Sequence, residues 1–160
     1  MKPGNFTQIY VHIVFAVKKR ESLLNDKIRN HIFEYMSGIA TTMKHKSIII
    51  NGVANHVHIL LGLNPAISIS NTVYSLKRSS SLYINKEKMC DGKFAWQEGY
   101  GAFTYSRSQI KNVYRYIQNQ EMHHKKKSFR DEYVDFLEKF EIDFDKRYLF
   151  TFLNDDVPGQ

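Results

Sequence analysis

The chain has 160 residues, of which 42% are hydrophobic and 24% charged, which is typical of one globular domain with a sizeable core. It contains no apolar run near the ~20 residues that a transmembrane helix needs and no signal-like N-terminal segment. Its single cysteine, Cys90, excludes an internal disulfide and fits a reducing cytoplasm. The net charge of +7 and the 14% aromatic content favour a polyanionic partner, nucleic acid first and an anionic membrane surface second.

The first half of the chain alternates strand and helix patterns. In its opening segment, apolar residues at every second position form one wholly apolar face, which is typical of a half-buried strand. The next segment has a capping residue followed by apolar residues at helical spacing. The predicted elements are, in order, a strand at 6–18, a helix from Asn25 or Asp26 to about 44, and strands at 47–53 and 56–63.

The second half begins with a helix pattern, continues through an aromatic segment and ends in further helices. Gly99 and Gly101 interrupt the aromatic segment and favour a bent strand or hairpin. Ser106 and Gln109 have the spacing of a capping box, which marks a helix start. The predicted elements are a helix at 67–88, the aromatic strand within 94–105, a helix from 106–109 to about 125, a helix at 128–140 and an aromatic tail at 144–153.

This element order predicts the fold class. A β-α-β-β-α-β sequence followed by helices indicates an α+β fold, with a ferredoxin-like antiparallel sheet, helices on one face and additional C-terminal helices. We therefore expect a single domain over residues 1–160, with its core at about 6–140 and an aromatic C-terminal tail at 141–160.

Two histidines on the strand at 56–63 are candidate metal ligands. Residues two apart on a strand point to the same face, so the imidazoles of His56 and His58 lie together while Val57 points into the core. Two neutral imidazoles on one face suit a divalent cation. The alternative is a pair of histidines on the solvent side of a half-buried sheet, and a His-x-His spacing alone does not choose between them.

The helix that follows the aromatic strand carries a phenol and an amide one turn apart. Its apolar stripe leaves Tyr116 and Gln120 together on one margin, with His123 on that same margin. Tyr114 and Gln118 repeat this spacing on the opposite margin. Spacing alone therefore leaves the two tyrosines equivalent, and both could simply be amphipathic rings at the edge of the core.

The motifs together resemble one family, the single-tyrosine HUH transposases of the insertion-sequence two-hundred type (TnpA-like), and are closest to its REP-associated branch. HUH denotes two histidines that flank a bulky hydrophobic residue. The resemblance runs from about residue 6 to 149, and its motifs occur in family order. They are an early His-Ile-Val-Phe strand, Asn55-His56-Val57-His58, Trp96-Gln97-x-Gly99-Tyr100-Gly101-x-Phe103, and Tyr116-Ile117-Gln118-Asn119-Gln120-x-x-His123-His124.

The resemblance implies roles for matching residues. Tyr116 would be the nucleophile, and Gln120 would complete a metal site with His56 and His58 for Mg²⁺ or Mn²⁺. The substrate would be single-stranded DNA next to a folded hairpin, and the protein would act as a homodimer. Attack by the phenol would yield a 5′-phosphotyrosine and a free 3′-OH, and a second 3′-OH could reverse the reaction and join strands without ATP.

Further residues are expected to support that chemistry. His12, His123 and His124 lie near the predicted site, where they could orient the ligands or substitute for them. Basic and hydroxyl clusters could instead contact phosphates, although each could equally be a solvated charge cluster. The candidate DNA contacts are Lys18, Lys19, Arg20, Lys77, Arg78, Ser79, Lys125, Lys126 and Lys127.

The sequence leaves two alternatives to a DNA-cleaving and strand-transferring transposase. One is a domesticated relative that binds hairpin DNA or RNA without cutting it, although the intact set of Tyr116, Gln120 and the two strand histidines favours activity. The other is a replication or relaxase-type HUH endonuclease, which the small size of the chain disfavours. In each case we expect a bacterial-type cytoplasmic protein without membrane association, located at the nucleoid when bound to DNA.

Overall fold

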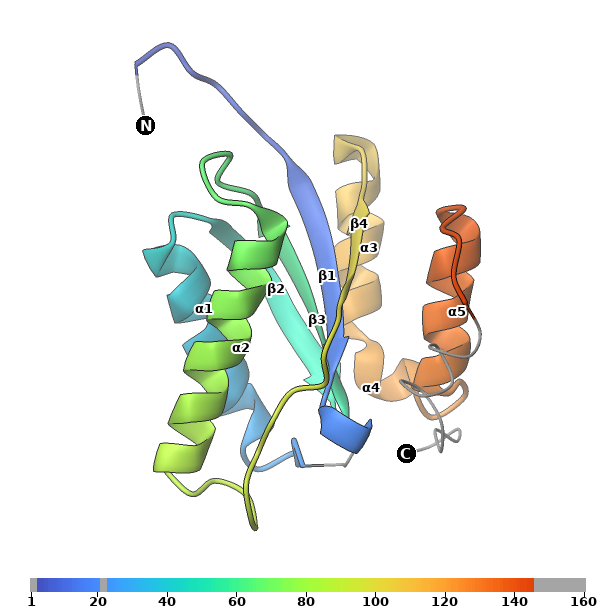
Figure 1. Cartoon of the computed structure of the whole chain (residues 1–160). Helices are drawn as coiled ribbons and strands as arrows, with labels where there is room; N and C mark the ends of the chain where they lie inside the picture. Colours follow the sequence, from blue (N-terminus) through green and yellow to red (C-terminus); the bar gives the residue numbers. More distant parts are fainter. Residues whose placement is uncertain (1–2, 21–22, 146–160) are drawn as a thin grey trace.

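A computed structural model of the chain describes residues 3–20 and 23–145, with the side chain of Arg20 outside the description. In chain order, the elements are β1 (Tyr10–Ala16), the 3-10 turn η1 (Lys18–Arg20), α1 (Arg29–Thr42), β2 (Lys46–Val53), β3 (His56–Gly62), α2 (Ile69–Lys86), β4 (Gly101–Thr104), η2 (Arg107–Gln109), α3 (Ile110–Gln118), α4 (Gln120–His123) and α5 (Phe129–Lys139). Figure 1 shows their arrangement.

The strands form one antiparallel sheet in the order β2-β3-β1-β4 within the described residues. Its two central strands pair so that Val14 lies opposite His58 and Ala16 lies opposite His56. Together with the element order β-α-β-β-α-β, this confirms the predicted ferredoxin-like α+β fold.

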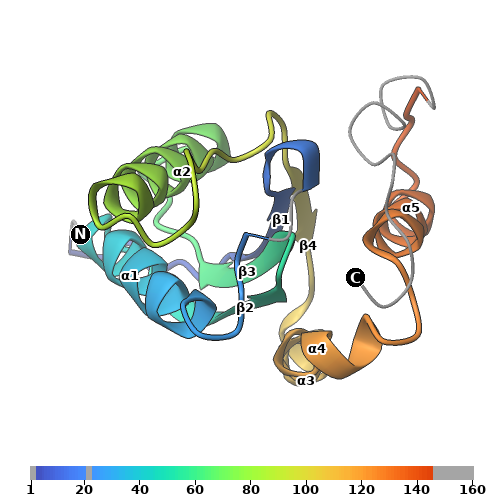
Figure 2. The same ribbon diagram turned by 90° about the horizontal axis from the view of Figure 1, so that it is seen from below.

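One face of the sheet is covered by α1 and α2, as Figure 2 shows. Alternate residues of the central strands, such as Ile13, Phe15 and Ile59, are fully buried and pack against Met36 of α1 and Leu76 of α2. The period of two in these strands and the apolar stripes of the helices therefore meet in one core.

The opposite face of the sheet is covered by the C-terminal helices (Figure 2). Leu60 packs against α3 at Val113 and Ile117. Val14 and Ala16 pack in a separate cluster with Phe129, Tyr133 and Leu137 of α5. The helices predicted on one face are α1 and α2, and the additional C-terminal helices cover the other face, where α5 closes over the histidines.

Several predicted boundaries differ from the structure. The first strand begins at Tyr10 rather than at residue 6, because pairing with β3 starts at Tyr10, pairing with β4 starts at Val11, and Phe6 is 91% exposed. The first helix begins at Arg29, since Asn25 instead accepts hydrogen bonds from Lys27 and Ile28 in a preceding turn.

The helix expected to run to about residue 125 is divided into α3 and α4. The division is at Asn119, which has φ −96° and ψ 21° and ends the first helix. The capping box between Ser106 and Gln109 is present as predicted, and it starts the turn that leads into α3. Ser128 caps α5 by accepting a hydrogen bond from the Asp131 backbone N–H.

The predicted aromatic tail falls mostly outside the described residues, since residues 146–160 are not described. Phe144 is described, and it packs against the cluster beneath α5. No helix in the described ranges combines the length and the apolar character needed to cross a membrane.

Candidate metal centre and nucleophile

The imidazoles of His56 and His58 lie on the face of β3 that the C-terminal helices cover. Both side chains are fully buried, which excludes a solvent-exposed pair. Val57, between them, packs in the core of α1 and α2 as predicted. Asn55 Oδ1 lies 2.8 Å from His56 Nδ1, so His56 donates there and directs the lone pair of its Nε2 into the site.

Tyr116 and Gln120 face these histidines from α3 and from the start of α4. The end of α3 is anchored to the sheet by Asn51 of β2, whose Nδ2 donates to the carbonyls of Ile117, at 2.9 Å, and Gln118, at 3.1 Å. Gln120 Oε1 lies 3.3 Å from His56 Nε2. The structure thus brings the predicted nucleophile and the amide ligand to the histidine pair within one chain.

The packing of α3 distinguishes Tyr114 from Tyr116, which helical spacing left equivalent. Tyr114 lies on the outward side of the helix and is 38% exposed. Tyr116 packs edge-on against the ring of His58, with 5.9 Å between centroids. Of the two phenols, Tyr116 is therefore the one that lies beside the histidine pair.

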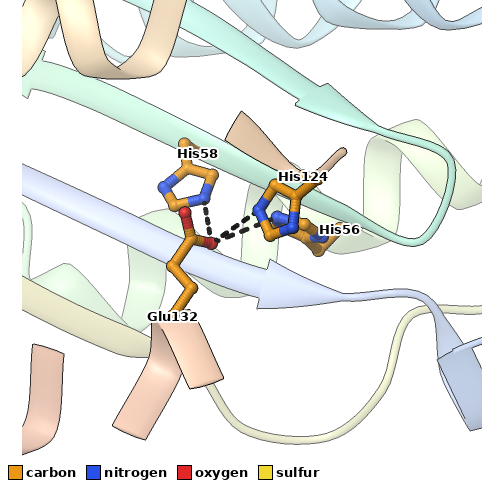
Figure 3. A group of neighbouring side chains, drawn as sticks. All are labelled: His56, His58, His124 and Glu132. Atoms are coloured by element: carbon orange, nitrogen blue, oxygen red, sulfur yellow. Dashed lines mark hydrogen bonds and ion pairs between the residues drawn. The ribbon is translucent and has the colours of Figure 1, made fainter. Parts of the chain in front are cut away.

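A carboxylate that the sequence interpretation did not assign, Glu132 of α5, lies at the centre of the site (Figure 3). Its Oε1 is 3.0 Å from His58 Nε2, 3.0 Å from His124 Nε2 and 3.3 Å from His56 Nε2. The side chain of Glu132 is 2% exposed. One carboxylate oxygen therefore faces three imidazole nitrogens in a region shielded from water.

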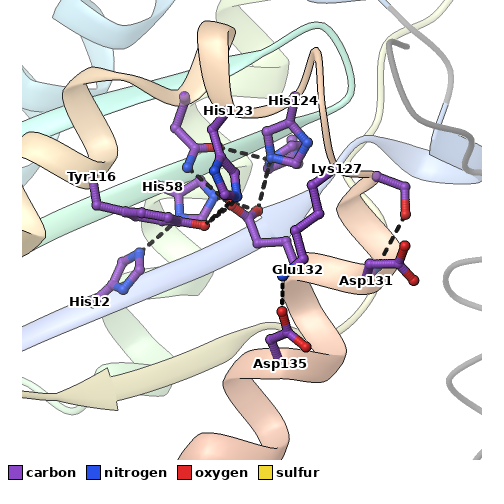
Figure 4. A network of polar contacts seen from close by, with 12 residues as sticks. His12, His58, Tyr116, His123, His124, Lys127, Asp131, Glu132 and Asp135 are labelled. Carbon is purple, nitrogen blue, oxygen red and sulfur yellow. Dashed lines mark hydrogen bonds and ion pairs between the residues drawn. The ribbon is translucent and has the colours of Figure 1, made fainter.

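The other oxygen of Glu132 connects the carboxylate to the nucleophile (Figure 4). The Tyr116 hydroxyl donates a hydrogen bond to Oε2, and Gln120 Nε2 donates to the same oxygen at 3.1 Å. Glu132 thus joins the histidines on one side to the phenol and the amide on the other.

Burial and charge fix the protonation states in this arrangement. Burial lowers the pKa of His56 to about 4 against the opposing effect of Glu132, so this imidazole is neutral and free to bind a cation. Burial alone would raise the pKa of Glu132, but attraction to His58 and the imidazole hydrogen bonds hold it well below its usual range. Burial and then the Glu132 carboxylate raise the pKa of Tyr116, so the phenol keeps its proton.

The cluster fits a divalent metal ion. His56, His58, His124 and Glu132 are all buried, and each offers one ligand atom, with these atoms all within 4.8 Å of one another. The Gln120 amide oxygen lies beside them. Neutral imidazoles with an ionised carboxylate are a donor set that divalent transition metals bind, and buried charge of this kind is typical of such sites.

Two of the expected supporting histidines contact the site without belonging to the cluster. His12 Nε2 lies 2.8 Å from His58 Nδ1, which orients that ring and leaves its other nitrogen for a ligand. His123 Nε2 lies 3.3 Å from the Tyr116 hydroxyl. His124 instead belongs to the cluster itself.

The candidate DNA contacts fall on different sides of the sheet. Lys77, Arg78 and Ser79 lie on α2, and the Lys77 ammonium donates to the carbonyls of Gln97 and Gly99, each at 2.7 Å. That lysine therefore holds the loop before β4. In contrast, Lys125, Lys126 and Lys127 follow α4 beside the site, and Lys18 and Lys19 lie exposed in η1.

A signal for Glu132 is present in the sequence. The residues of α5 that pack on the sheet, Phe129, Tyr133 and Leu137, recur at helical spacing, and Glu132 falls on this same buried stripe. A carboxylate on the apolar face of a helix calls for a buried partner, which marks a candidate functional residue. The identity of the partner is visible only in the tertiary structure.

Comparisons with known proteins connect this site to a family. The sequence profile described as Transposase IS200 like matches residues 5–120. ISDra2 transposase TnpA from Deinococcus radiodurans is 26% identical over 123 residues, which cover 73% of this chain and 87% of that protein.

Two solved structures share the fold. A protein of Deinococcus radiodurans R1 assigned as a transposase has a TM-score of 0.59 at 24% identity, covering 75% of this chain and 96% of that one. A REP-associated tyrosine transposase bound to a REP hairpin has a TM-score of 0.57 at 11% identity, covering 78% of this chain and 74% of the other. The family match ends before His124 and Glu132, which complete the cluster.

Proposed function

Since the chain belongs to the family of IS200-like transposases, we propose that it cleaves and rejoins single-stranded DNA beside a hairpin, with Tyr116 as the nucleophile. The observation that carries this proposal is the Tyr116 hydroxyl, which hydrogen-bonds to the carboxylate at the centre of the buried histidine cluster. The hairpin as substrate is supported by the fold shared with a transposase bound to a REP hairpin.

The proposed metal site contains the ligands expected from sequence and two more. His56, His58 and Gln120 would hold Mg²⁺ or Mn²⁺ together with His124 and Glu132. When bound, the dication supplies charge that favours the Tyr116 phenolate, polarises the scissile phosphate and stabilises the departing oxygen. His12 would keep the His58 ring in its ligating orientation.

The covalent step follows from the position of the phenol. Tyr116 loses its proton toward Glu132 or His123, the two groups that its hydroxyl contacts. The phenolate oxygen forms a bond to phosphorus, while the bond between phosphorus and the 3′ oxygen breaks and that oxygen leaves with the electron pair. Because the phosphotyrosine conserves the phosphodiester, attack by a 3′-OH from another strand regenerates Tyr116 and joins the DNA.

The rest of the chain would bind DNA and a second subunit. Lys125, Lys126 and Lys127 lie nearest to the site among the proposed phosphate contacts, and Lys18, Lys19, Arg20 and Arg78 would bind farther along the strand. We also propose that the protein acts as a homodimer, as its resemblance to this family implies. We propose a cytoplasmic location at the nucleoid, which the net charge of +7 supports.

The test is a covalent adduct between the protein and a hairpin oligonucleotide with single-stranded flanks. In the presence of Mn²⁺ or Mg²⁺, we expect an adduct with the wild-type protein that denaturing electrophoresis resolves. Tyr116→Phe should form none, because it lacks the attacking oxygen, while Tyr114→Phe should react near the wild-type rate since Tyr114 points outward.

Two outcomes would contradict the proposal. An adduct that persists in Tyr116→Phe and disappears in Tyr114→Phe would reassign the nucleophile. Tight hairpin binding without any adduct across metal concentrations would favour the binding module that does not cut DNA.

A further inference from the structure

A pocket of about 340 Å³ opens between α3 and α5. Its inner end is formed by Tyr116, His123 and Glu132, and its walls include the aromatic residues Tyr105 and Phe136. This volume lies within the range of ~300–1,000 Å³ that is typical of pockets for small organic groups. The pocket therefore adjoins the proposed nucleophile and has the size of a ligand site.

The pocket is the side from which a phosphodiester can approach the phenol. The groups behind Tyr116, namely His56, His58 and Gln120, are fully buried against the sheet. Tyr116 itself is only partly buried and lines the pocket. A strand that reaches the Tyr116 hydroxyl from this side would bring a flanking nucleotide to the pocket.

Asn112 provides the means to read a base there. It lies one helical turn before Tyr116 on α3, so both side chains share one side of the helix and both line the pocket. Asn112 is exposed, and its side-chain amide forms no hydrogen bond within the described part of the chain. A side-chain amide presents one donor and one acceptor, the pair that recognises a base edge.

The walls of the pocket suit a stacked base and its phosphate. Tyr105 and Phe136 are half-buried rings that pack on Phe140 and Phe103, respectively, and also line the pocket. Bases pack on such rings in single-stranded complexes. The Lys139 ammonium lies 5.8 Å from the centroid of Tyr105, at the pocket, and forms no ion pair with any residue in 3–20 or 23–145. Lys127, on the same pocket, is paired with Asp135. Lys139 is thus the cation available for a phosphate.

We propose that this pocket binds one nucleotide of the DNA strand directly beside the scissile phosphate and selects its base. The base packs against the pocket-lining rings of Tyr105 and Phe136, Asn112 reads its edge, and Lys139 contacts the phosphate of that nucleotide. The inference rests on the proposed function, since it takes Tyr116 as the nucleophile. It assigns the base specificity of that reaction to residues of α3 and α5 and to Tyr105.

The first experiment uses hairpin oligonucleotides with randomised single-stranded flanks. Adducts are isolated, the attached strands are sequenced, and the adduct rate is measured. We expect the wild-type protein to prefer one base beside the attached phosphate, and Asn112→Ala to weaken that preference about tenfold, as expected for loss of one paired contact. Lys139→Gln should slow the reaction without changing the preferred base.

The matched control is Lys111→Gln, which removes an exposed lysine of α3 that does not line the pocket and should leave rate and preference unchanged. An unchanged base preference in Asn112→Ala would overturn the inference. A wild-type adduct without base preference beside the phosphate would also overturn it.

A second measurement keeps the pocket testable without catalysis. Tyr116→Phe protein is photocrosslinked to random-sequence single-stranded DNA that contains 5-iododeoxyuridine, and the crosslinked peptides are mapped by mass spectrometry. Crosslinks at Tyr105 or Phe136 support the pocket, and crosslinks exclusively elsewhere overturn it. If the wild-type protein forms no adduct, the proposed function fails, while this crosslink still decides whether DNA occupies the pocket.

Discussion

At the level of single residues, Glu132 connects the candidate metal ligands to the candidate nucleophile. Its two oxygens divide the contacts, since one faces three imidazoles and the other accepts hydrogen bonds from Tyr116 and Gln120. A donor set with three imidazoles is softer than the oxygen-rich sites that Mg²⁺ prefers, so we expect this site to bind Mn²⁺ more tightly than Mg²⁺.

Removing the charge of Glu132 should weaken metal binding, because Glu132 supplies the carboxylate of the candidate metal site. Glu132→Gln keeps the size of the side chain but removes the carboxylate, and we expect the affinity for Mn²⁺ to fall by ~10- to 100-fold or more. Isothermal titration calorimetry measures this change. The matched control is Glu138→Gln, an exposed carboxylate on the same helix, which should bind Mn²⁺ as the wild-type protein does.

The opposite result has a clear meaning. If Glu132→Gln binds Mn²⁺ as tightly as the wild-type protein, Glu132 is not a ligand. The carboxylate would then merely hold Tyr116 and the histidines in place.

At the level of elements, the position of Glu132 depends on how closely α5 approaches β4. Gly101 of β4 has no side chain, and a Cβ there would lie 2.9 Å from the Tyr133 hydroxyl of α5 and 3.0 Å from the ring of Phe103 in the same strand. Tyr133 follows Glu132 directly in α5 and packs on the sheet with Phe129 and Leu137. A glycine in the aromatic strand thus allows the helix with the carboxylate to lie against the sheet.

This close contact predicts that adding a methyl group at Gly101 destabilises the fold. Gly101→Ala should displace Tyr133 and lower the free energy of unfolding by about 1–3 kcal/mol, as overpacking does. Thermal or urea unfolding measures the loss. In the double variant Gly101→Ala with Tyr133→Phe, the loss should be smaller than the sum of the two single losses, because the closest contact of the new Cβ is removed while the contact with Phe103 remains. Additive losses would show that the hydroxyl does not limit the approach.

At the level of the whole molecule, the candidate site is assembled from segments of one chain. Within one chain, Tyr116 of α3 contacts Glu132 of α5 and packs against His58 of β3. If this arrangement persists in a homodimer, each subunit would carry its own site.

Mixed subunits distinguish a site within one chain from a shared one. When Tyr116→Phe and His58→Asn chains are co-expressed and purified together, we expect no recovery of adduct formation, because each chain lacks one part of its own site. Co-expression of either variant with the wild-type chain serves as the control and should remain active. Recovery of activity in the mixture of the two variants would show that the tyrosine of one subunit serves the histidines of the other.

Much of the fold followed from local patterns. The period of two in the strand around His12 and the His56-Val57-His58 triplet correctly predicted which side chains share a sheet face, since this is a property of the extended backbone itself. The element order correctly predicted the ferredoxin-like sheet. Boundaries such as the break at Asn119 were missed, because they depend on contacts with other elements, here the hydrogen bonds from Asn51 of β2.

The sequence by itself determined the family motifs and the histidine pair, because a strand places residues two apart on one face. Helical spacing left Tyr114 and Tyr116 equivalent, and the resemblance to a family singled out Tyr116. Only the tertiary structure revealed that Glu132 joins Tyr116 to the histidine pair, since it lies 74 residues from His58 in the chain and reaches it through the packing of α5 on the sheet. The same packing buried the histidines, turned Tyr114 outward and formed the pocket beside Tyr116. Contacts between distant segments follow from how whole surfaces pack, and no local pattern contains that information.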